Sequence, residues 1–386
     1  MRILNSLYYY RPHYSGLTVY TERLARELGA RGHEVTILTS RYDRSLPKDE
    51  QLDGVRIRRV PVALMVSKGP IMPGFLPLAN RLIAEHDLLH LHVPQLDAAP
   101  MSFLSRMHHK PVVVTYHCDL RLPPSLLNRV ANELSNLANR ITLGAADRVI
   151  ANTSDYAGSS PLLSTRQGKI AIIPPPIEIP EVENERIASL RDRWKLALGE
   201  PIIGMVARLA SEKGAEVLIH AMPEILRVFP GARVLYVGQH ENVMGEESYR
   251  RRLEPLIQEL GRHWTFLGVL DSQDLAAFYS LCDVVVLPSL NSTESFGMVQ
   301  VESMLCGTPV IASDLPGVRE PTHATGMGLT FPPGDNQALA VGILEILQWP
   351  ERFHASEDQV RARYGTAAVA DQYEALFRSL LHLPGA

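Results

Sequence analysis

The stretch from Asp283 to Glu320 constrains the fold more than any other part of the chain. A β-branched run at 284–287 is bounded by Pro288, and apolar residues at helical spacing follow from about 296 to 306. A second short apolar run, at 309–312, completes the unit. Strand, helix and strand in this order predict a βαβ unit of a parallel sheet. The sequence therefore predicts an α/β fold whose ligands lie where strand ends meet helix starts.

Two glutamates occupy that junction. Glu294 precedes the predicted helix and Glu302 lies about two turns inside it, or ~12 Å further along the axis. The amides between them form a helix N-terminus without a capping side chain, which attracts an anion. Either glutamate alone is more often merely solvated, but a carboxylate on each side of an anion site matches a nucleotide sugar. The amides predicted to bind the diphosphate are those of Phe296, Gly297, Met298 and Val299.

Two cations lie in another loop of this kind. Arg208 and Lys213 follow a strand-like run at 201–206 and precede Gly214 and a helical pattern. Arg offers a planar fork of donors and Lys a compact charge, and both suit a diphosphate. Most surface cations bind no ligand, yet this pair stands between a strand end and a helix start. We therefore predict that Arg208 and Lys213 hold the diphosphate.

The first half of the chain begins with a similar strand, loop and helix. A strand at 2–7 leads through an aromatic loop to Gly16, which lets a backbone approach a phosphate, and Thr18 is the predicted N-cap of the next helix. A dinucleotide site would show G-x-G-x-x-G here. Only one glycine is present, so hydride transfer loses its main support.

Histidines lie on two predicted strands of this half. A strand at 111–115 delivers His117 to its carboxyl end, where such sheets place chemistry. We predict that His117 contacts the ligand, and the alternative is a histidine that bonds a neighbouring carbonyl. His90 and His92, expected on opposite faces of a strand at 88–92, are interpreted as core or strand-end residues.

Size and composition predict two domains. A chain of 386 residues with 46% apolar content can bury a substantial core. We predict domains at 1–180 and 181–366, separated by the prolines at 174–176, and a final helix at 367–386 that crosses back to the first domain. No apolar run approaches about 18 residues and the start of the chain lacks a signal-peptide pattern, which predicts a cytoplasmic protein.

Neither a metal nor a cofactor is expected. The three cysteines are odd in number and widely spaced, so they predict no disulfide framework and no zinc site. No Asp-x-Asp occurs, so a divalent-metal clamp on a diphosphate is not expected.

Charge is distributed unevenly. Residues 1–180 carry 21 Lys and Arg against 15 Asp and Glu, whereas the rest carries 17 against 27. A basic first half suits an anionic acceptor, or peripheral contact with lipid head groups at the inner membrane surface, although scattered solvated charges are commoner. An amphipathic segment at 120–143 is most simply a core-facing helix, and a membrane-surface role stays open for it. No nucleic-acid partner is expected.

These motifs resemble the signature of the retaining glycosyltransferases of family 4. In that family E-x-F-G opens the helix and a second Glu follows after seven intervening residues, as Glu294 and Glu302 do here. The family's R-x4-K-G element is matched by 208–214, and its histidine at a strand end by His117.

Three positions depart from the family pattern. The first loop has the single Gly16, Pro175-Pro176 stands in place of Asn-Gly, and no Gly-x-Gly-Pro turn follows Gly238.

The resemblance covers essentially the whole chain and implies the GT-B architecture, two Rossmann-like doubly wound parallel-sheet domains facing a cleft. It implies retaining, metal-independent transfer of a hexosyl unit from a UDP- or GDP-linked sugar to a glycan, lipid-linked or small-molecule acceptor. Glu294 would hold the sugar hydroxyls, His117 would support the sugar, and Glu302 would accept from the ribose. The backbone at Gly268 and Val269 would pair with the base, and loops 8–15 and 66–77 would contact the acceptor.

Three other functions stay open. A sugar-nucleotide epimerase shares the architecture and needs no acceptor. A glycan phosphorylase would need a pyridoxal-binding Lys and a longer chain. A non-catalytic nucleotide-sugar-binding module would keep Arg208, Lys213 and Glu302 but need not keep His117 and Glu294, so the presence of all five favours an enzyme.

Overall fold

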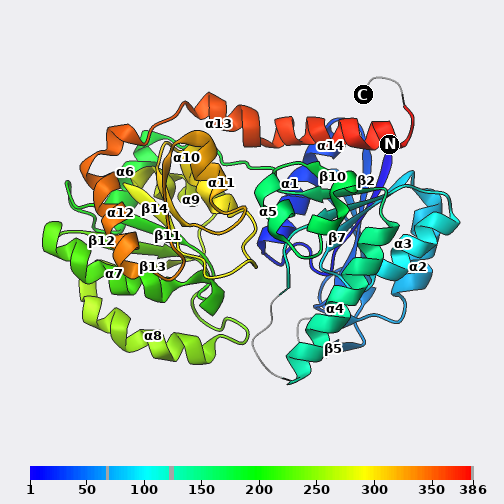
Figure 1. Ribbon diagram of the computed structural model, residues 1–386, viewed down its shortest axis with the longest axis horizontal. Helices are drawn as coiled ribbons and strands as arrows, with labels where there is room; N and C mark the ends of the chain where they lie inside the picture. The colour runs from blue at the N-terminus through cyan, green and yellow to red at the C-terminus, as the bar shows by residue number, and fades with distance from the viewer. Residues whose placement is uncertain (67–68, 121–125, 384–386) are drawn as a thin grey trace. The chain divides into compact units, whose positions relative to one another are not determined.

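The computed structural model describes residues 1–66, 69–120 and 126–383. The chain forms two compact units (Figure 1). Unit 1 comprises Met1–Pro176 together with Tyr364–Ala386, and unit 2 comprises Ile177–Arg363. The last helix of the chain therefore belongs to the same unit as the first strand.

Unit 2 is built on a six-stranded sheet with the order β13-β12-β11-β14-β15-β16, in which every neighbouring pair is parallel. The winding starts at β11, moves outward to β13, and then returns to the other side of β11 with β14. This is the doubly wound order of dinucleotide-binding folds, whose ligands lie where the winding reverses. The strands are β11 (Ile202–Val206), β12 (Arg233–Val237), β13 (Trp264–Gly268), β14 (Val284–Leu287), β15 (Val310–Ser313) and β16 (Gly328–Phe331).

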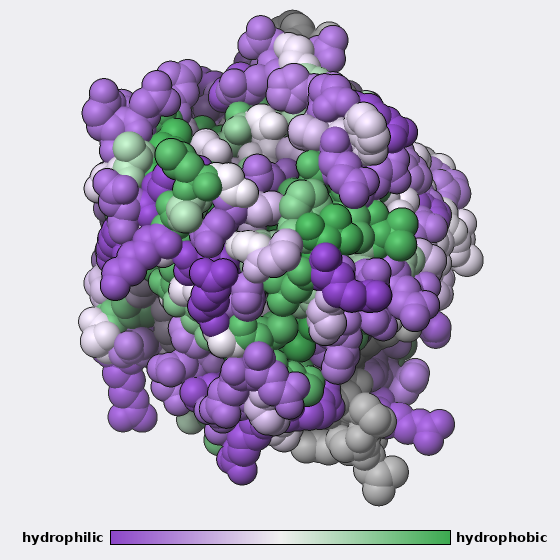
Figure 2. Space-filling view, turned by 90° about the vertical axis from the view of Figure 1, so that its left-hand side faces the viewer, coloured by the Kyte–Doolittle hydropathy of each residue, from purple (hydrophilic) through white to green (hydrophobic). Residues whose placement is uncertain are grey.

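Helices on both faces bury this sheet, which explains why its strands are continuous apolar runs. All four residues of β14, VVVL, are buried, and so are those of β15. The helices are α6 (Asn184–Arg193), α7 (Ala215–Val228), α8 (Glu247–Leu260), α9 (Ser272–Leu281), α10 (Met298–Leu305), α11 (Glu320–Thr325), α12 (Asn336–Gln348) and α13 (Glu357–Tyr364). Figure 2 shows the side on which α7, α8 and α12 lie, where apolar residues appear among a majority of hydrophilic ones.

Unit 1 has an eight-stranded sheet with the order β10-β9-β8-β7-β1-β2-β4-β3. Its strands are parallel except for β3, which forms an antiparallel hairpin with β4. The sequence analysis found no strand at β3, because its DEQL sequence lacks the apolar alternation of a half-buried strand. The strands are β1 (Arg2–Ser6), β2 (Glu34–Arg41), β3 (Asp49–Leu52), β4 (Val55–Pro61), β7 (Leu88–Val93), β8 (Val112–Tyr116), β9 (Arg148–Ala151) and β10 (Ile170–Ile172).

A small hairpin and six helices complete unit 1 within the described residues. The hairpin pairs β5 (Leu64–Val66) with β6 (Gly69–Ile71), so part of the predicted acceptor loop 66–77 is strand, and residues 67–68 lie outside the described residues. The helices are α1 (Gly16–Ala30), α2 (Phe75–Glu85), α3 (Ala98–Met107), α4 (Leu126–Ala145), α5 (Ser154–Ser159) and α14 (Thr366–Leu380). Of the predicted amphipathic segment 120–143, residues 121–125 lie outside the described residues.

One local prediction was wrong. The N-cap of α1 is Ser15 rather than Thr18, because the Ser15 hydroxyl accepts from the Thr18 amide at 3.2 Å. The polar stretch after Gly238 leads into helix α8, whose charged residues and Pro255 hide its amphipathic spacing. No helix among the described residues is long and apolar enough to cross a membrane.

Candidate active site

The loops that follow β11 and β14 meet at the point where the winding of unit 2 reverses. β11 and β14 are neighbours in the sheet, and the Leu290 amide donates to the Glu212 carbonyl at 2.9 Å between their loops. Gly214 has a φ of +67°, and a Cβ there would lie 2.1 Å from the Pro288 carbonyl oxygen. Only glycine allows this approach.

Lys213 and Glu294 form an ion pair between these two loops. The Lys213 Nζ lies 2.5 Å from Glu294 Oε2, and the two side chains are 23% and 17% exposed. The sequence predicts that the lysine binds the diphosphate and that the glutamate binds the sugar. The structure brings the two side chains together, and both keep some access to solvent.

Arg208 lies on the same loop and has a carboxylate partner of its own. Its Nη2 donates to Glu212 Oε1 at 3.2 Å, and the Arg208 side chain is 42% exposed. Each predicted cation is therefore balanced by an acid, which lowers the cost of holding two positive charges in one loop.

Two helices begin directly after these loops. α7 begins after Gly214 and α10 begins after Gly297, both glycines are left-handed, and neither helix has a capping side chain. A Cβ on Gly297 would lie 2.3 Å from Leu287 Cδ2, so this position too requires glycine. Because α10 starts at Met298, the predicted amides of Phe296 and Gly297 precede the helix, whereas those of Met298 and Val299 belong to its first turn.

Glu302 is buried, contrary to the solvated alternative. It is 6% exposed, and its Oε2 accepts from the Tyr279 hydroxyl of α9 at 3.0 Å. Since α10 begins at Met298, Glu302 lies about one turn inside the helix and not two. A carboxylate held in one orientation by a tyrosine is prepared to accept from a further hydroxyl group.

The residues predicted to meet the base lie at the end of β13. Gly268 has a φ of +74°, and its carbonyl accepts from the Gly238 amide at 2.7 Å. Val269 is 72% exposed. A Cβ on Gly238 would lie 2.1 Å from the Ala207 carbonyl oxygen, so the loops after β11, β12 and β13 form one close-packed rim.

In unit 1, His117 follows the carboxyl end of β8 and is half-buried. Its Nε2 lies 3.0 Å from Nδ1 of His92, and burial lowers the pKa of His117 to about 3. The expectation that His90 and His92 lie on opposite faces was wrong: residues two apart in a strand share a face, and their ring centroids are 4.3 Å apart. Gly16, predicted to approach the donor, is the exposed first residue of α1.

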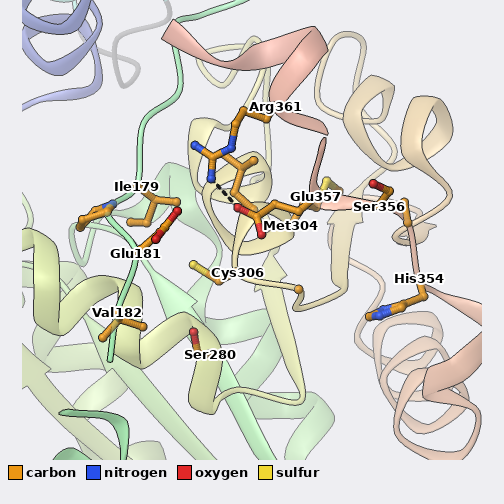
Figure 3. Close-up of a pocket in the computed structure, with 14 residues that line it drawn as sticks. Ile179, Glu181, Val182, Ser280, Met304, Cys306, His354, Ser356, Glu357 and Arg361 are labelled. Carbon is orange, nitrogen blue, oxygen red and sulfur yellow. Dashed lines mark hydrogen bonds and ion pairs between the residues drawn. The ribbon is translucent and has the colours of Figure 1, made fainter. Parts of the chain in front are cut away.

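A pocket of about 770 Å³ lies elsewhere in unit 2 (Figure 3). It lies at the C-terminal end of α10, the end away from the Lys213–Glu294 pair, and none of the predicted site residues lines it. In Figure 3 the Arg361 guanidinium points to Glu357, with which it forms an ion pair. Burial raises the pKa of the Cys306 thiol to about 12, so this cysteine is not a thiolate nucleophile at neutral pH.

Comparison with known proteins places the chain in a family. The model described as "Glycosyl transferases group 1" matches residues 187–364, and the model "Glycosyltransferase Family 4" matches residues 14–180. The chain is 30% identical over 340 residues to a D-inositol 3-phosphate glycosyltransferase of Nocardia farcinica, covering 81% of this chain and 73% of that one. The chain belongs to the family 4 glycosyltransferases.

Other relatives of this glycosyltransferase agree. It is 29% identical over 378 residues to a phosphatidyl-myo-inositol mannosyltransferase of Mycobacterium leprae, covering 95% of this chain and 93% of the relative. Because these relatives are transferases, the epimerase alternative is not favoured.

Solved structures confirm the GT-B fold of the glycosyltransferase. A sucrose-phosphate synthase of Thermosynechococcus elongatus superposes with a TM-score of 0.79 at 26% identity, covering 99% of both chains. Anabaena HepE, solved with UDP and glucose, superposes with a TM-score of 0.78 at 20% identity, covering 98% of this chain and 100% of that one, which shows the fold alone.

Several partners of the site residues are not predicted from the sequence. Glu212 could have been found, because its spacing of four residues from Arg208 is typical of an ion pair. Tyr279 carries no local signal, because it meets Glu302 from another helix. Nor does any local pattern reveal the contacts of Tyr20 and Tyr373 described below.

Proposed function

We propose that this glycosyltransferase moves a hexosyl unit from a UDP- or GDP-linked sugar to a hydroxyl-bearing acceptor, with retention of configuration and without a metal ion or cofactor. The observation that carries the proposal is the Lys213–Glu294 ion pair between two loops that each run into an uncapped helix N-terminus. A cation for the diphosphate and a carboxylate for the sugar hydroxyls thereby stand side by side in unit 2.

Breaking the bond from the anomeric carbon leaves negative charge on the diphosphate. An ammonium group has three donors, and one of those of Lys213 bonds Glu294, so two remain for phosphate oxygens. Arg208 and the first amides of α7 and α10 complete a set of donors fixed before the reaction, which is the arrangement that most lowers the barrier.

The sugar develops an oxocarbenium-like centre as the diphosphate leaves. In this proposal Glu294 orients the sugar hydroxyls, Glu302 accepts from the ribose, and the backbone at Gly268 and Val269 meets the base. The acceptor hydroxyl attacks the face that the diphosphate leaves, and a diphosphate oxygen takes its proton, so configuration is retained. His117 accepts a hydrogen bond from the donor sugar, and Gly16 admits the donor to the start of α1.

Two relatives suggest the kind of acceptor. Their names specify phosphatidyl-myo-inositol and D-inositol 3-phosphate, both of which combine ring hydroxyls with a phosphate. The basic balance of residues 1–180 suits such an anion. We therefore propose a phosphorylated polyol, free or lipid-linked, as the acceptor.

A panel of UDP- and GDP-sugars tests the function, with nucleoside diphosphate release measured with and without inositol phosphates and phosphatidylinositol. We expect release that depends on the acceptor and is unaffected by a chelator. The anomeric configuration of the product, determined by NMR, checks retention. An altered sugar nucleotide formed without acceptor would instead identify an epimerase.

Peripheral contact with an anionic membrane surface is a second proposal. On α4 the exposed Leu134, Leu137 and Ile141 lie on one side of the helix, and Arg129 and Arg140 are exposed on the same helix. Co-sedimentation with vesicles of anionic or zwitterionic lipid tests it. We expect binding to the anionic vesicles alone, reduced by salt and by Leu137→Glu, and equal binding to both vesicle types would contradict the proposal.

A further inference from the structure

A row of three histidines lies at the carboxyl edge of the unit 1 sheet. His90 and His92 lie on β7, and the His92 ring stacks on that of His117 with centroids 5.2 Å apart and an interplanar angle of 22°. The 3.0 Å hydrogen bond between His92 Nδ1 and His117 Nε2 needs a proton between the two nitrogens. One histidine of the pair therefore donates and the other accepts. A metal site is not the explanation of this arrangement, because the described residues contain no group of side chains that could hold a metal ion.

Asn5 of β1 and Thr21 of α1 also face the His92 ring. Thr21 Oγ1, which can donate as well as accept, lies 3.5 Å from Nδ1 and does not distinguish the two tautomers. Asn5 Oδ1, which can only accept, lies 3.3 Å from Nε2 of His92. His92 Nε2 is therefore protonated, its Nδ1 accepts, and His117 Nε2 donates. The Nδ1 of His117 then keeps its lone pair, and it makes no hydrogen bond within the described part of the chain. Burial keeps both rings neutral, because it lowers the pKa of each.

Tyr20 of α1 closes the other side of the His117 ring. The edge-to-face contact has centroids 5.0 Å apart at 86°, and Tyr20 also meets the His92 ring at 6.1 Å. The Tyr20 side chain is 2% exposed, and its hydroxyl lies 2.5 Å from that of Tyr373 on α14. The orientation of Tyr20 is thus tied to the last helix of the chain.

Tyr373 also contacts His90, one of the three histidines, through Thr115 and through its own ring. Its hydroxyl lies 3.0 Å from Thr115 Oγ1, which in turn lies 2.7 Å from Nε2 of His90. The Tyr373 and Phe377 rings pack against the His90 ring with centroids 5.5 and 5.6 Å away. One hydroxyl group of α14 therefore supports both the tyrosine and the histidines that enclose His117.

α14 is held on unit 1 by contacts that do not involve this hydroxyl. Arg31 at the end of α1 bonds Asp371 at 2.5 Å and donates to the Ala367 carbonyl at 2.8 Å. Removing the Tyr373 hydroxyl alone should leave the helix in place.

We propose that Tyr373 is a positioning residue for His117. Through Tyr20, and through Thr115 and His90, it fixes the orientation of the His117 ring. That orientation maintains the bond to His92 that sets the Nε2–H tautomer, so that Nδ1 can accept from a hydroxyl of the donor sugar. The use of that nitrogen by a sugar rests on the proposed function. The orientation and tautomer of the ring do not, since both are properties of the free protein.

The first test is NMR of the unliganded protein with 15N-labelled histidine. The His117 signals are assigned by their loss in His117→Ala. We expect the neutral Nε2–H tautomer, and in Tyr373→Phe a shift of both ring nitrogens toward the average of the two tautomers. Ser102→Ala is the matched control, because it removes a buried hydroxyl of α3 whose bond goes to the Ala98 carbonyl. An Nδ1–H tautomer, or signals unchanged in Tyr373→Phe, would overturn the inference.

The second test is a double-mutant cycle on turnover. Tyr373→Phe should lower kcat about fivefold with little change in donor KM, and should have no further effect in a His117→Ala background, although its effect on Tm persists there. Equal losses of kcat in both backgrounds would show a merely structural role. Tyr20→Phe breaks the same contact from α1 and replaces Tyr373→Phe if that variant fails to fold. Absence of turnover with any sugar nucleotide would contradict the proposed function, and the NMR result would still decide the state of the ring.

Discussion

The carboxyl edges of the two sheets use opposite electrostatics. In unit 2 the loops after β11 and β14 carry paired charges, Arg208 with Glu212 and Lys213 with Glu294, held close by glycines. In unit 1 the edge carries neutral imidazoles packed against tyrosine rings. The first arrangement suits a ligand that is highly charged, such as a diphosphate. The second suits hydroxyl groups, which need oriented acceptors and little charge.

This contrast explains why the sequence predicted the charged residues of the unit 2 edge, whereas at the unit 1 edge it predicted His117 but not the residues that enclose it. The charged loops are local motifs. Arg208 and Lys213 lie in the same loop, five residues apart, and Glu294 lies three residues before Gly297. The neutral edge depends on contacts between residues far apart in the chain, such as Tyr20 with Tyr373, 353 positions apart.

Arg208 of the charged edge should affect turnover more than any other residue considered. Arg208→Ala should lower kcat about 10²- to 10³-fold, because it removes a donor to charge that develops only in the transition state. Arg208→Lys should recover part of that loss. Steady-state kinetics with the preferred sugar nucleotide measure this, and a change in donor KM with kcat intact would contradict the assignment.

Because the charged loops are closely packed, replacing Gly214 should lower the stability of the protein strongly. Gly214→Ala should lower the free energy of unfolding by about 3 kcal/mol, since it adds a clash with the Pro288 carbonyl to the strain of a positive φ. The matched control is Gly326→Ala, at a φ of +69° with nothing within 4 Å, which should cost about 1 kcal/mol. Urea unfolding measures both, and equal losses would show that the approach of the loops is unimportant.

Acid should weaken unit 1 through its neutral histidines. Burial lowers the pKa of His90 to about 3, below the value of about 6.5 in the unfolded chain, so the folded state binds fewer protons. Stability is therefore complete above about pH 6.5 and falls as pH decreases, by about 2 kcal/mol at pH 5 for this residue alone.

Asp97 opposes this trend, because burial raises its pKa to about 6. Thermal unfolding measured between about pH 6.5 and pH 5 checks whether stability falls on acidification. The variant His90→Asn should lose less stability over this range. A protein that becomes more stable on acidification would contradict the claim that these histidines are neutral in the folded state.

The smallest effect concerns the ribose. Glu302→Gln should raise donor KM about fivefold, or ~1 kcal/mol, with kcat nearly unchanged, because ribose contacts are the same in ground and transition states. Tyr279→Phe, which removes one hydrogen bond to the Glu302 carboxylate, should act in the same direction but less. A loss confined to kcat would place Glu302 near the reacting carbon instead.

The fold was largely predictable from the sequence, because apolar runs and helical spacing are local properties. The parallel sheet of unit 2 was predicted from the alternation of such runs, and the Arg208–Lys213 loop from its charges. The start of α10 was not predictable to the residue, since Gly297 delays the helix to Met298 and moves Glu302 to its second turn. Burial of Glu302 depends on Tyr279, and the environment of His117 depends on α14. Neither neighbour can be located from a pattern within a single segment.

Because Tyr364–Ala386 belong to unit 1, the half of the protein that is translated first is completed last. A nascent chain emerging from the ribosome already holds β1 to β10 while α14 is still unmade. Until α14 is made, the Tyr20 hydroxyl lacks its partner on Tyr373, and His90 lacks the two rings that cover it. A polypeptide that stops before α14 would therefore have a complete unit 2 and an incomplete unit 1.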